Sequence, residues 1–383
     1  MPVATIFKFN QESRRLNTQD QARLTQLFER LSERTDQFLG YPVAKDFDYQ
    51  HLVQFLDLPL NNIGDPFAPS TYQVDTREFE REVLEFSARL LRAEENSWWG
   101  YVTNGGSEGN LYGLYLAREL FPKAMVYFSE TTHYSVSKNL HLLGMRHIMI
   151  RAQESGEIDY ADLRETLRLH RDQVPILFAN IGTTMTEGKD DLVKIRQIFK
   201  EMAIGESYIH CDAALCGFMA PFLTPRPAFD FADGADSISI SGHKFIGSPI
   251  PCGVVLARKR HVERIARSIA YIGNLDTTIS GSRNGLTPLI LWTAIRRLGD
   301  EGFRERVQQS LDLADYACAR LCAVGVKAWR NPNALTVVFP SPSVEVRSRW
   351  QLASADGASH ILTLPNVRRE QIDQFVEDVA AEF

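Results

Sequence analysis

A lysine that directly follows a short predicted strand is the first residue whose placement suggests chemistry. In the run SISISGHK (residues 237–244), serine and isoleucine alternate, so that one face of the strand is apolar and the other is polar. Lys244 ends this run, and glycine or proline follows at 247, 249, 251 and 253. Enzymes keep an amine that binds an aldehyde in this kind of turn. A solvated loop lysine is the alternative that the residue alone leaves open.

An aspartate ends a second predicted strand. The run YIHCD (208–212) carries Asp212 to the end of an apolar stretch, 32 residues before Lys244. A carboxylate buried there is costly unless it meets a cation or several hydrogen-bond donors. The protonated pyridine nitrogen of a cofactor is such a cation, and keeping it protonated makes the ring an electron sink. A helix-capping aspartate is the alternative.

A glycine-rich turn follows a third strand and opens a helix. In VTNGGSEGN (102–110) the glycines let backbone N–H groups approach an anion, Ser107 adds a hydroxyl, and the helix N-terminus favours negative charge. The turn lacks the lysine of a nucleotide P-loop and the spacing of a dinucleotide fingerprint. The pattern therefore predicts a phosphate cradle.

His133 follows a fourth strand, where its ring could stack on a flat cofactor. All four elements lie at strand ends, and open α/β sheets gather their ligands at such ends. A zinc site made of His210, Cys211, Asp212 and Cys216 is disfavoured, because adjacent strand residues point to opposite faces.

The elements that must position these residues follow an α/β pattern. Between about residues 99 and 258, short apolar runs alternate with helical patterns, which indicates a mostly parallel sheet covered by helices. The runs are WGYVT, MVYFS, HIMI, ILFANIG, SYIHCDAA, SISISGHK and CGVVLAR. We expect a large domain at 46–285 and a small C-terminal α+β domain at 286–383.

The two ends of the chain complete this plan. A capping-box pattern at Thr18 and Gln21 predicts a first helix that ends near Gly40, within an N-terminal arm of residues 1–45. In the small domain, a long helical connection precedes predicted strands at VKAWR, LTVVF and HILTL, and a helix ends the chain.

Composition excludes several classes of protein. The chain has 383 residues, 44% of them hydrophobic, and a formal net charge of −6, which argues against disorder and against nucleic-acid binding. Its five cysteines are few and mostly lie in apolar stretches, as expected for reduced thiols in a cytoplasmic protein. No signal peptide or membrane-spanning segment is expected.

From about Gly40 to the C-terminus, the sequence resembles the pyridoxal-phosphate-dependent group II amino-acid decarboxylases, in the branch of histidine decarboxylases and plant-type serine decarboxylases. The motifs that carry the resemblance are GYVTNGGSEGN, THYSV, FANIGTT, IHCDAAL, SGHKFIGSPIPCG and GSRNG. The resemblance implies the fold type I architecture of aspartate aminotransferase, with pyridoxal 5′-phosphate as cofactor. It also implies a homodimer whose active sites lie at the subunit interface.

The resemblance also assigns roles to individual residues. Lys244 would be the Schiff-base lysine, Asp212 would face the pyridine nitrogen, and His133 would stack on the cofactor beside the substrate. The segment 271–283 would cover the site and offer Tyr271 for protonation of the product. The further cofactor-binding residues would be Gly106, Ser107, Ala214, Ser241 and His243.

The predicted reaction is the decarboxylation of L-histidine to histamine, with L-serine to ethanolamine as the alternative. For serine, Asp65 in NNIGDPF (61–67) could hold the hydroxyl. Leu286 stands where relatives often have histidine, and it is a candidate substrate contact. Glu187 and Lys189 replace an uncharged pair, so that local shape is in question. The rivals are an aminotransferase or another lyase, which would need a fixed arginine, and a non-catalytic protein, which would commonly lose the lysine.

Overall fold

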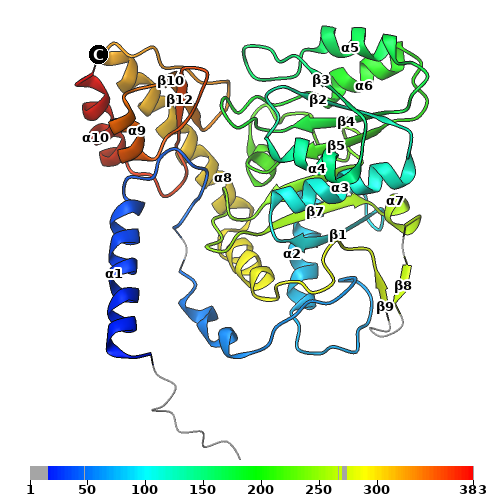
Figure 1. Cartoon of the computed structure of the whole chain (residues 1–383), viewed down its shortest axis with the longest axis horizontal. Helices are drawn as coiled ribbons and strands as arrows, with labels where there is room; N and C mark the ends of the chain where they lie inside the picture. Colours follow the sequence, from blue (N-terminus) through cyan, green and yellow to red (C-terminus); the bar gives the residue numbers. More distant parts are fainter. Residues whose placement is uncertain (1–15, 47, 266, 270–273, 383) are drawn as a thin grey trace, which may run out of the picture.

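The centre of the molecule is a seven-stranded, mostly parallel sheet (Figure 1). The computed structural model describes residues 16–46, 48–265, 267–269 and 274–382. The strand order is β1-β7-β6-β5-β4-β2-β3, and β7 is antiparallel to both its neighbours. The strands are β1 (Trp98–Thr103), β2 (Met125–Ser129), β3 (His147–Ile150), β4 (Pro175–Asn180), β5 (Tyr208–Asp212), β6 (Ser237–Ser241) and β7 (Gly253–Arg258). Each of the seven apolar runs thus forms the strand predicted for it.

Helices cover both faces of this sheet. Consecutive residues of a strand point to opposite faces, so Val126 and Phe128 of β2 pack on one side and Tyr127 on the other. The first side is covered by α3 (Gly106–Leu120), α4 (Ser135–Leu143) and α7 (Lys259–Glu263), and the second by α2 (Arg77–Leu90), α5 (Tyr160–Leu169) and α6 (Leu192–Glu201). This two-sided burial confirms the predicted α/β fold class.

The C-terminal part is a smaller α+β unit. It begins with α8 (Leu286–Ala323), which is kinked at Gly299. A three-stranded antiparallel sheet of β10 (Thr336–Pro340), β12 (Ala358–Leu362) and β11 (Ala353–Ala355) packs with α9 (Val344–Trp350) and α10 (Arg369–Ala380). The domain boundaries at 45 and 285 stay predictions.

The strand expected at VKAWR (326–330) does not form. Only Trp329 makes an isolated bridge, to Val338. The chain leaves the sheet after this bridge because Arg330 is held by Asp315, and Asn331 donates to the carbonyl oxygens of Ser155 and Thr186.

The N-terminal helix α1 (Thr18–Thr35) stands apart from the rest of the molecule and has no buried residue (Figure 1). Its cap is Asn17, whose side chain accepts from the Asp20 N–H, so the predicted capping box at Thr18 was wrong by one residue. The helix also ends before Gly40, because the segment after it bonds to the C-terminal unit: Leu39 N donates to the Trp350 carbonyl.

The remaining elements are short. The described residues between Gly40 and α2 are irregular apart from η2 (Gln50–Asp57), and β8 (Arg267–Ile269) and β9 (Asn274–Asp276) form a separate two-stranded antiparallel sheet. Among the described residues, no helix combines the length and apolarity that crossing a bilayer requires.

Candidate active site

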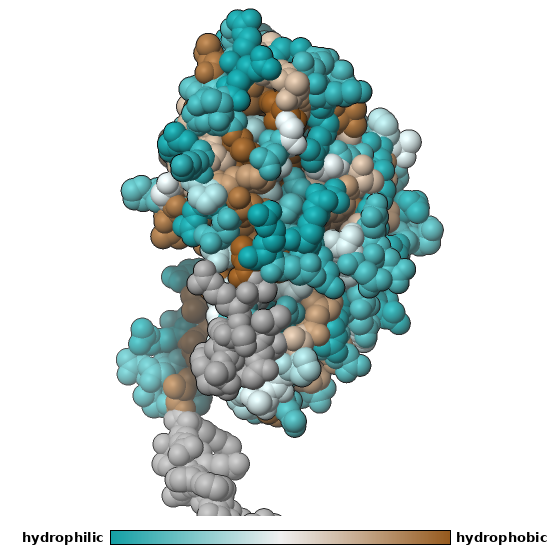
Figure 2. Space-filling model, turned by 90° about the vertical axis from the view of Figure 1, so that its right-hand side faces the viewer, coloured by the Kyte–Doolittle hydropathy of each residue, from teal (hydrophilic) through white to brown (hydrophobic). Residues whose placement is uncertain are grey.

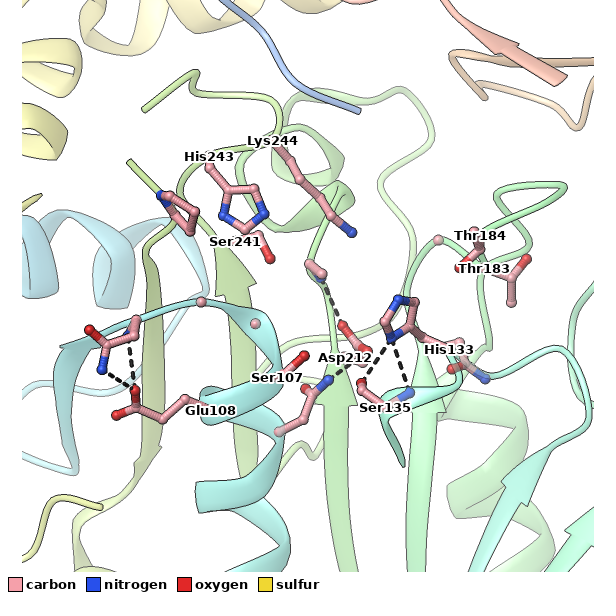
Figure 3. A pocket seen from close by; sticks show the side chains of 18 residues that line it. Ser107, Glu108, His133, Ser135, Thr183, Thr184, Asp212, Ser241, His243 and Lys244 are labelled. Atoms are coloured by element: carbon pink, nitrogen blue, oxygen red, sulfur yellow. Dashed lines mark hydrogen bonds between the residues drawn. The ribbon is translucent and has the colours of Figure 1, made fainter. Parts of the chain in front are cut away.

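A cavity of about 460 Å³ lies where β4, β5 and β6 end, and it gathers the residues singled out from the sequence (Figure 3). Lys244, Asp212 and His133 line it together with all the other predicted cofactor-binding residues, which are Gly106, Ser107, Ala214, Ser241 and His243. Strands and helices more than a hundred residues apart in sequence therefore contribute to one wall. This placement matches the rule that ligands bind at strand ends in open α/β sheets.

Lys244 follows β6 in the turn that its glycines and prolines predict, and its side chain points into the cavity (Figure 3). Within the described part of the chain, its Nζ makes no hydrogen bond; only its backbone carbonyl accepts one, from Ala44 N. Burial lowers the pKa of Lys244, while the nearby Asp212 carboxylate and Cys216 thiol act to raise it. Burial thus enlarges the neutral, nucleophilic fraction of this amine.

Asp212 ends β5 and lies across the cavity from Lys244 (Figure 3). Its Oδ1 accepts from Ala214 N at 3.0 Å, and its Oδ2 accepts from Asn110 Nδ2 at 2.7 Å. The short 3-10 turn that follows, Cys216–Phe218, is capped by Leu215, so Asp212 is not a helix cap. The carboxylate keeps acceptor capacity that faces the cavity.

Asn110 was missed from the sequence, although its spacing gave a signal. It lies four residues after Gly106 and therefore on the same face of α3, the face that packs on the sheet. Asn180, Thr183 and Thr184 also line the cavity. Their motif, FANIGTT, had indicated the family and not the role of each residue.

The glycine-rich turn that was predicted to hold a phosphate lies between β1 and α3. Gly105 has φ +150° and ψ 173°, a conformation open essentially to glycine alone, and α3 begins at the next residue. A Cβ on Gly106 would lie 2.6 Å from Ser241 Oγ, so the absence of a side chain lets the loop approach β6 closely. The backbone N–H groups of this turn, with Ser107, Ser241 and His243, form a concave wall suited to an anion.

His133 is held in one tautomer. Its Nδ1 lies 2.8 Å from Ser135 Oγ and accepts from the Ser135 N–H at 3.3 Å. A backbone N–H only donates, so the neutral ring carries its proton on Nε2. Burial lowers the pKa of His133, which favours that neutral ring. The residue thus offers a flat face and one N–H donor at the cavity wall.

The residues present fit pyridoxal phosphate. The Lys244 amine, which has no hydrogen-bond partner among the described residues, can meet the aldehyde. A carboxylate with spare capacity can meet the pyridine nitrogen, and a helix N-terminus with two hydroxyls can meet the phosphate. Among the described residues, no group of three or more His, Cys, Asp or Glu side chains could hold a metal ion.

Two predicted substrate contacts lie elsewhere in this chain. Asp65 accepts from Trp99 Nε1 at 2.9 Å and from Phe67 N at 2.8 Å, and it does not line the cavity. Leu286 begins α8 and packs against a small apolar cluster that includes Leu52. Tyr271 lies outside the described residues. The substrate roles of Asp65 and Leu286 and the catalytic role of Tyr271 stay predictions.

Comparison with known proteins gives one consistent result. Residues 78–326 match the model of the pyridoxal-dependent decarboxylase conserved domain. The chain is 54% identical to a histidine decarboxylase of Mesorhizobium japonicum, over 95% of this chain and 99% of that one, and 46% identical to a histidine decarboxylase of Morganella morganii, over 90% and 92%. Its structure is similar to that of an L-methionine decarboxylase of Streptomyces, with a TM-score of 0.88 and 26% identity over 96% of each chain.

Proposed function

Because this chain belongs to the family of pyridoxal-dependent decarboxylases, we propose that it removes the carboxylate of L-histidine and releases histamine. The observation that carries the substrate is the 54% identity to a histidine decarboxylase over nearly the full length of both chains. The polar cavity wall, with Ser135, Asn180 and Thr183, is compatible with an imidazole side chain.

The cofactor supplies an aldehyde for the amino group and a pyridinium ring that accepts the electrons of the broken bond. The chain's own residues prepare these groups. Lys244 offers a partly neutral amine, and Asp212, which lines the cavity, would hold the proton at the pyridine nitrogen. The Nε2–H of His133 can donate a hydrogen bond to the substrate carboxylate.

The lining of the cavity favours loss of the carboxylate over its retention. No arginine is found among the described residues that line it. A carboxylate that is not neutralised by a fixed guanidinium is easier to expel as CO₂, whereas an aminotransferase would bind it firmly. This supports a decarboxylase over the aminotransferase alternative.

Competition between L-histidine and L-serine tests the substrate. Both amino acids are supplied at equal concentration in one reaction, and histamine, ethanolamine and CO₂ are quantified. We expect histamine in large excess. Ethanolamine in excess would show that serine, and not histidine, is the substrate. Keto-acid products would show that the reaction is transamination and not decarboxylation.

We also infer a homodimer, and the surface of α1 supports it. Leu24, Leu27, Phe28 and Leu31 recur at helical spacing and are exposed, Phe28 by 72%. Such a stripe on a helix that stands apart from its own chain is suited to a second copy. The side of the molecule with α5, α6 and α7 is by contrast mostly hydrophilic, with apolar residues scattered over it (Figure 2).

Subunit mixing tests whether the sites are shared. If Tyr271 serves the neighbouring subunit, a mixture of inactive Lys244→Ala and Tyr271→Phe chains should recover about a quarter of wild-type activity, because half of the chains pair as heterodimers with one intact site. No recovery after verified exchange would indicate sites complete within one chain.

The five cysteines are free thiols, which supports the inferred cytoplasmic location.

A further inference from the structure

A continuous chain of buried hydrogen bonds runs from Asp212 away from the cavity. Tyr208, His210 and Asp212 alternate along β5 and therefore share the face that packs on α3. Asn110 Nδ2 donates to Asp212 Oδ2 at 2.7 Å, and Asn110 Oδ1 lies 3.0 Å from His210 Nε2. His210 Nδ1 lies 2.7 Å from Ser237 Oγ, which accepts from Tyr208 Oη at 2.9 Å.

Only one arrangement of protons satisfies every link. The NH₂ group of Asn110 donates to Asp212 Oδ2, so its amide oxygen faces His210. The Nε2 of His210 must then carry a proton. The ring is neutral, since burial lowers the pKa of His210 to about 3, so its Nδ1 is bare and accepts from Ser237. Every donor therefore points toward Asp212.

Close packing of α3 on β5 and β6 encloses this series of hydrogen-bonded side chains. His210 is fully buried, and a Cβ on Gly113 would lie 2.1 Å from its Nδ1. Gly106 and Gly113, seven residues apart on α3, bring the helix close enough to β5 and β6 for polar side chains to fill the space between them. Such close packing leaves His210 little freedom to rotate.

We propose that Asn110 and His210 are positioning residues, which hold the carboxyl group of Asp212 in place and directed at the pyridine nitrogen of the cofactor. The role rests on the proposed cofactor chemistry. Aligned hydrogen bonds polarise one another in a low-dielectric interior, so each donor behind Asn110 strengthens the bond to the carboxylate. Ser237 and Tyr208 complete the chain by holding His210 in the required tautomer.

Replacement of His210 by Phe, in the full-length protein, tests the proposal. The substitution keeps an aromatic ring, although a larger one, and Asn110 loses its donor. We expect the dissociation constant of pyridoxal phosphate, measured by titration of the cofactor-free chain, to rise roughly tenfold. His210→Gln, whose amide N–H can replace the donor, should recover most of the loss. Ser237→Ala, a smaller deletion at the far side of His210, should have an intermediate effect.

His360→Phe is the matched control. His360 is also a buried histidine with a lowered pKa, but it lies in β12, where its Nε2 contacts the Gly40 carbonyl. We expect a similar drop in melting temperature and a cofactor affinity within about twofold of wild type. Equal affinity losses in His210→Phe and His360→Phe would reduce His210 to a packing residue.

The tautomer can be measured without reference to activity. In the wild-type protein with ¹⁵N-labelled histidine, NMR should show His210 neutral, with its proton on Nε2, throughout pH 5 to 8. A proton on Nδ1, or titration within this range, would overturn the directed chain. If these results hold while histamine is not formed, the substrate proposal fails and the positioning role stands.

Discussion

Two buried carboxylates lie close to the cavity, and they differ in how completely they are hydrogen-bonded. Asp212 accepts two hydrogen bonds, from Asn110 and Ala214, and its remaining capacity faces the cavity. Glu187 is wholly buried and is surrounded by donors. A carboxylate with unused capacity beside a cavity can bind a further cation, whereas a saturated one can only hold its neighbours in place.

The partners of Glu187 come from two parts of the chain. Its Oε2 accepts from Leu335 N, Thr336 N and Thr336 Oγ1 of the C-terminal unit, at 2.8 to 3.0 Å. Its Oε1 pairs with Lys189 Nζ at 3.0 Å and receives the Cys216 thiol at 3.7 Å. Glu187 and Lys189 therefore form a buried ion pair that links the loop after β4 to the C-terminal sheet.

The largest expected effect is at Lys244, which lines the cavity. Lys244→Ala should abolish turnover and the visible absorbance of the bound cofactor, because no other lining residue offers an amine. Absorbance spectra and product assays at saturating cofactor measure both. Activity near that of wild type would contradict the assignment of the Schiff-base lysine.

Asp212→Asn should lower kcat on the order of a thousandfold while the chain stays folded. A neutral amide cannot hold the proton at the pyridine nitrogen, although it can still accept from Asn110. Steady-state kinetics, with a thermal melt as control, separate the two effects. Unchanged turnover would place Asp212 with Glu187 as a structural acid.

Glu187→Gln should produce the opposite result. It leaves Lys189 buried without its counter-charge, which should lower the free energy of unfolding by about 3 kcal/mol. The kcat of the folded, cofactor-loaded fraction should change by less than about threefold. Urea unfolding gives the first quantity, and active-site titration gives the second. A large fall in kcat without loss of stability would break the comparison.

Lowering the pH should reduce the free energy of unfolding through His210, which lies behind Asp212, more than through His360, which lies near Glu187. His210 stays neutral in the folded chain down to its pKa of about 3, whereas an unfolded histidine takes up a proton below about pH 6.5. The unfolded state therefore binds more protons between these values, and stability falls as pH falls, by up to about 1.4 kcal/mol per pH unit.

Urea unfolding between pH 7 and pH 5 measures this slope. His210→Phe should remove a larger share of it than His360→Phe, the corresponding buried histidine near Glu187. Burial alone lowers the pKa of His210, whereas a hydrogen bond to Gly40 and the charge of Glu187 oppose the lowering of the pKa of His360 by burial. An equal share for both would show that acid sensitivity does not distinguish the two regions.

The sequence by itself determined the strands of the large sheet and the candidate residues at their ends. Alternating or continuous apolar runs specify strands locally, and in parallel sheets a polar residue just past such a run lies at the ligand-binding edge. Lys244, Asp212, His133 and the glycine turn were found for this reason, and the cavity brings them together. The capping box at Thr18 failed because the preceding Asn17 caps the helix by a local hydrogen bond from Asp20 N. The strand at VKAWR failed because tertiary contacts of Arg330 and Asn331 lead the chain away from the sheet.

Only the tertiary structure decided which buried carboxylates have all their acceptor positions filled by hydrogen bonds and which keep acceptor capacity facing the cavity. Asn110 is 102 residues from Asp212 in sequence, and Thr336 is 149 residues from Glu187. A hydrogen bond needs its two atoms within about 3 Å and in line, a condition that residue type and spacing do not encode over such separations. Residue type alone therefore does not separate Asp212, which we propose for the chemistry, from Glu187, which holds the C-terminal unit.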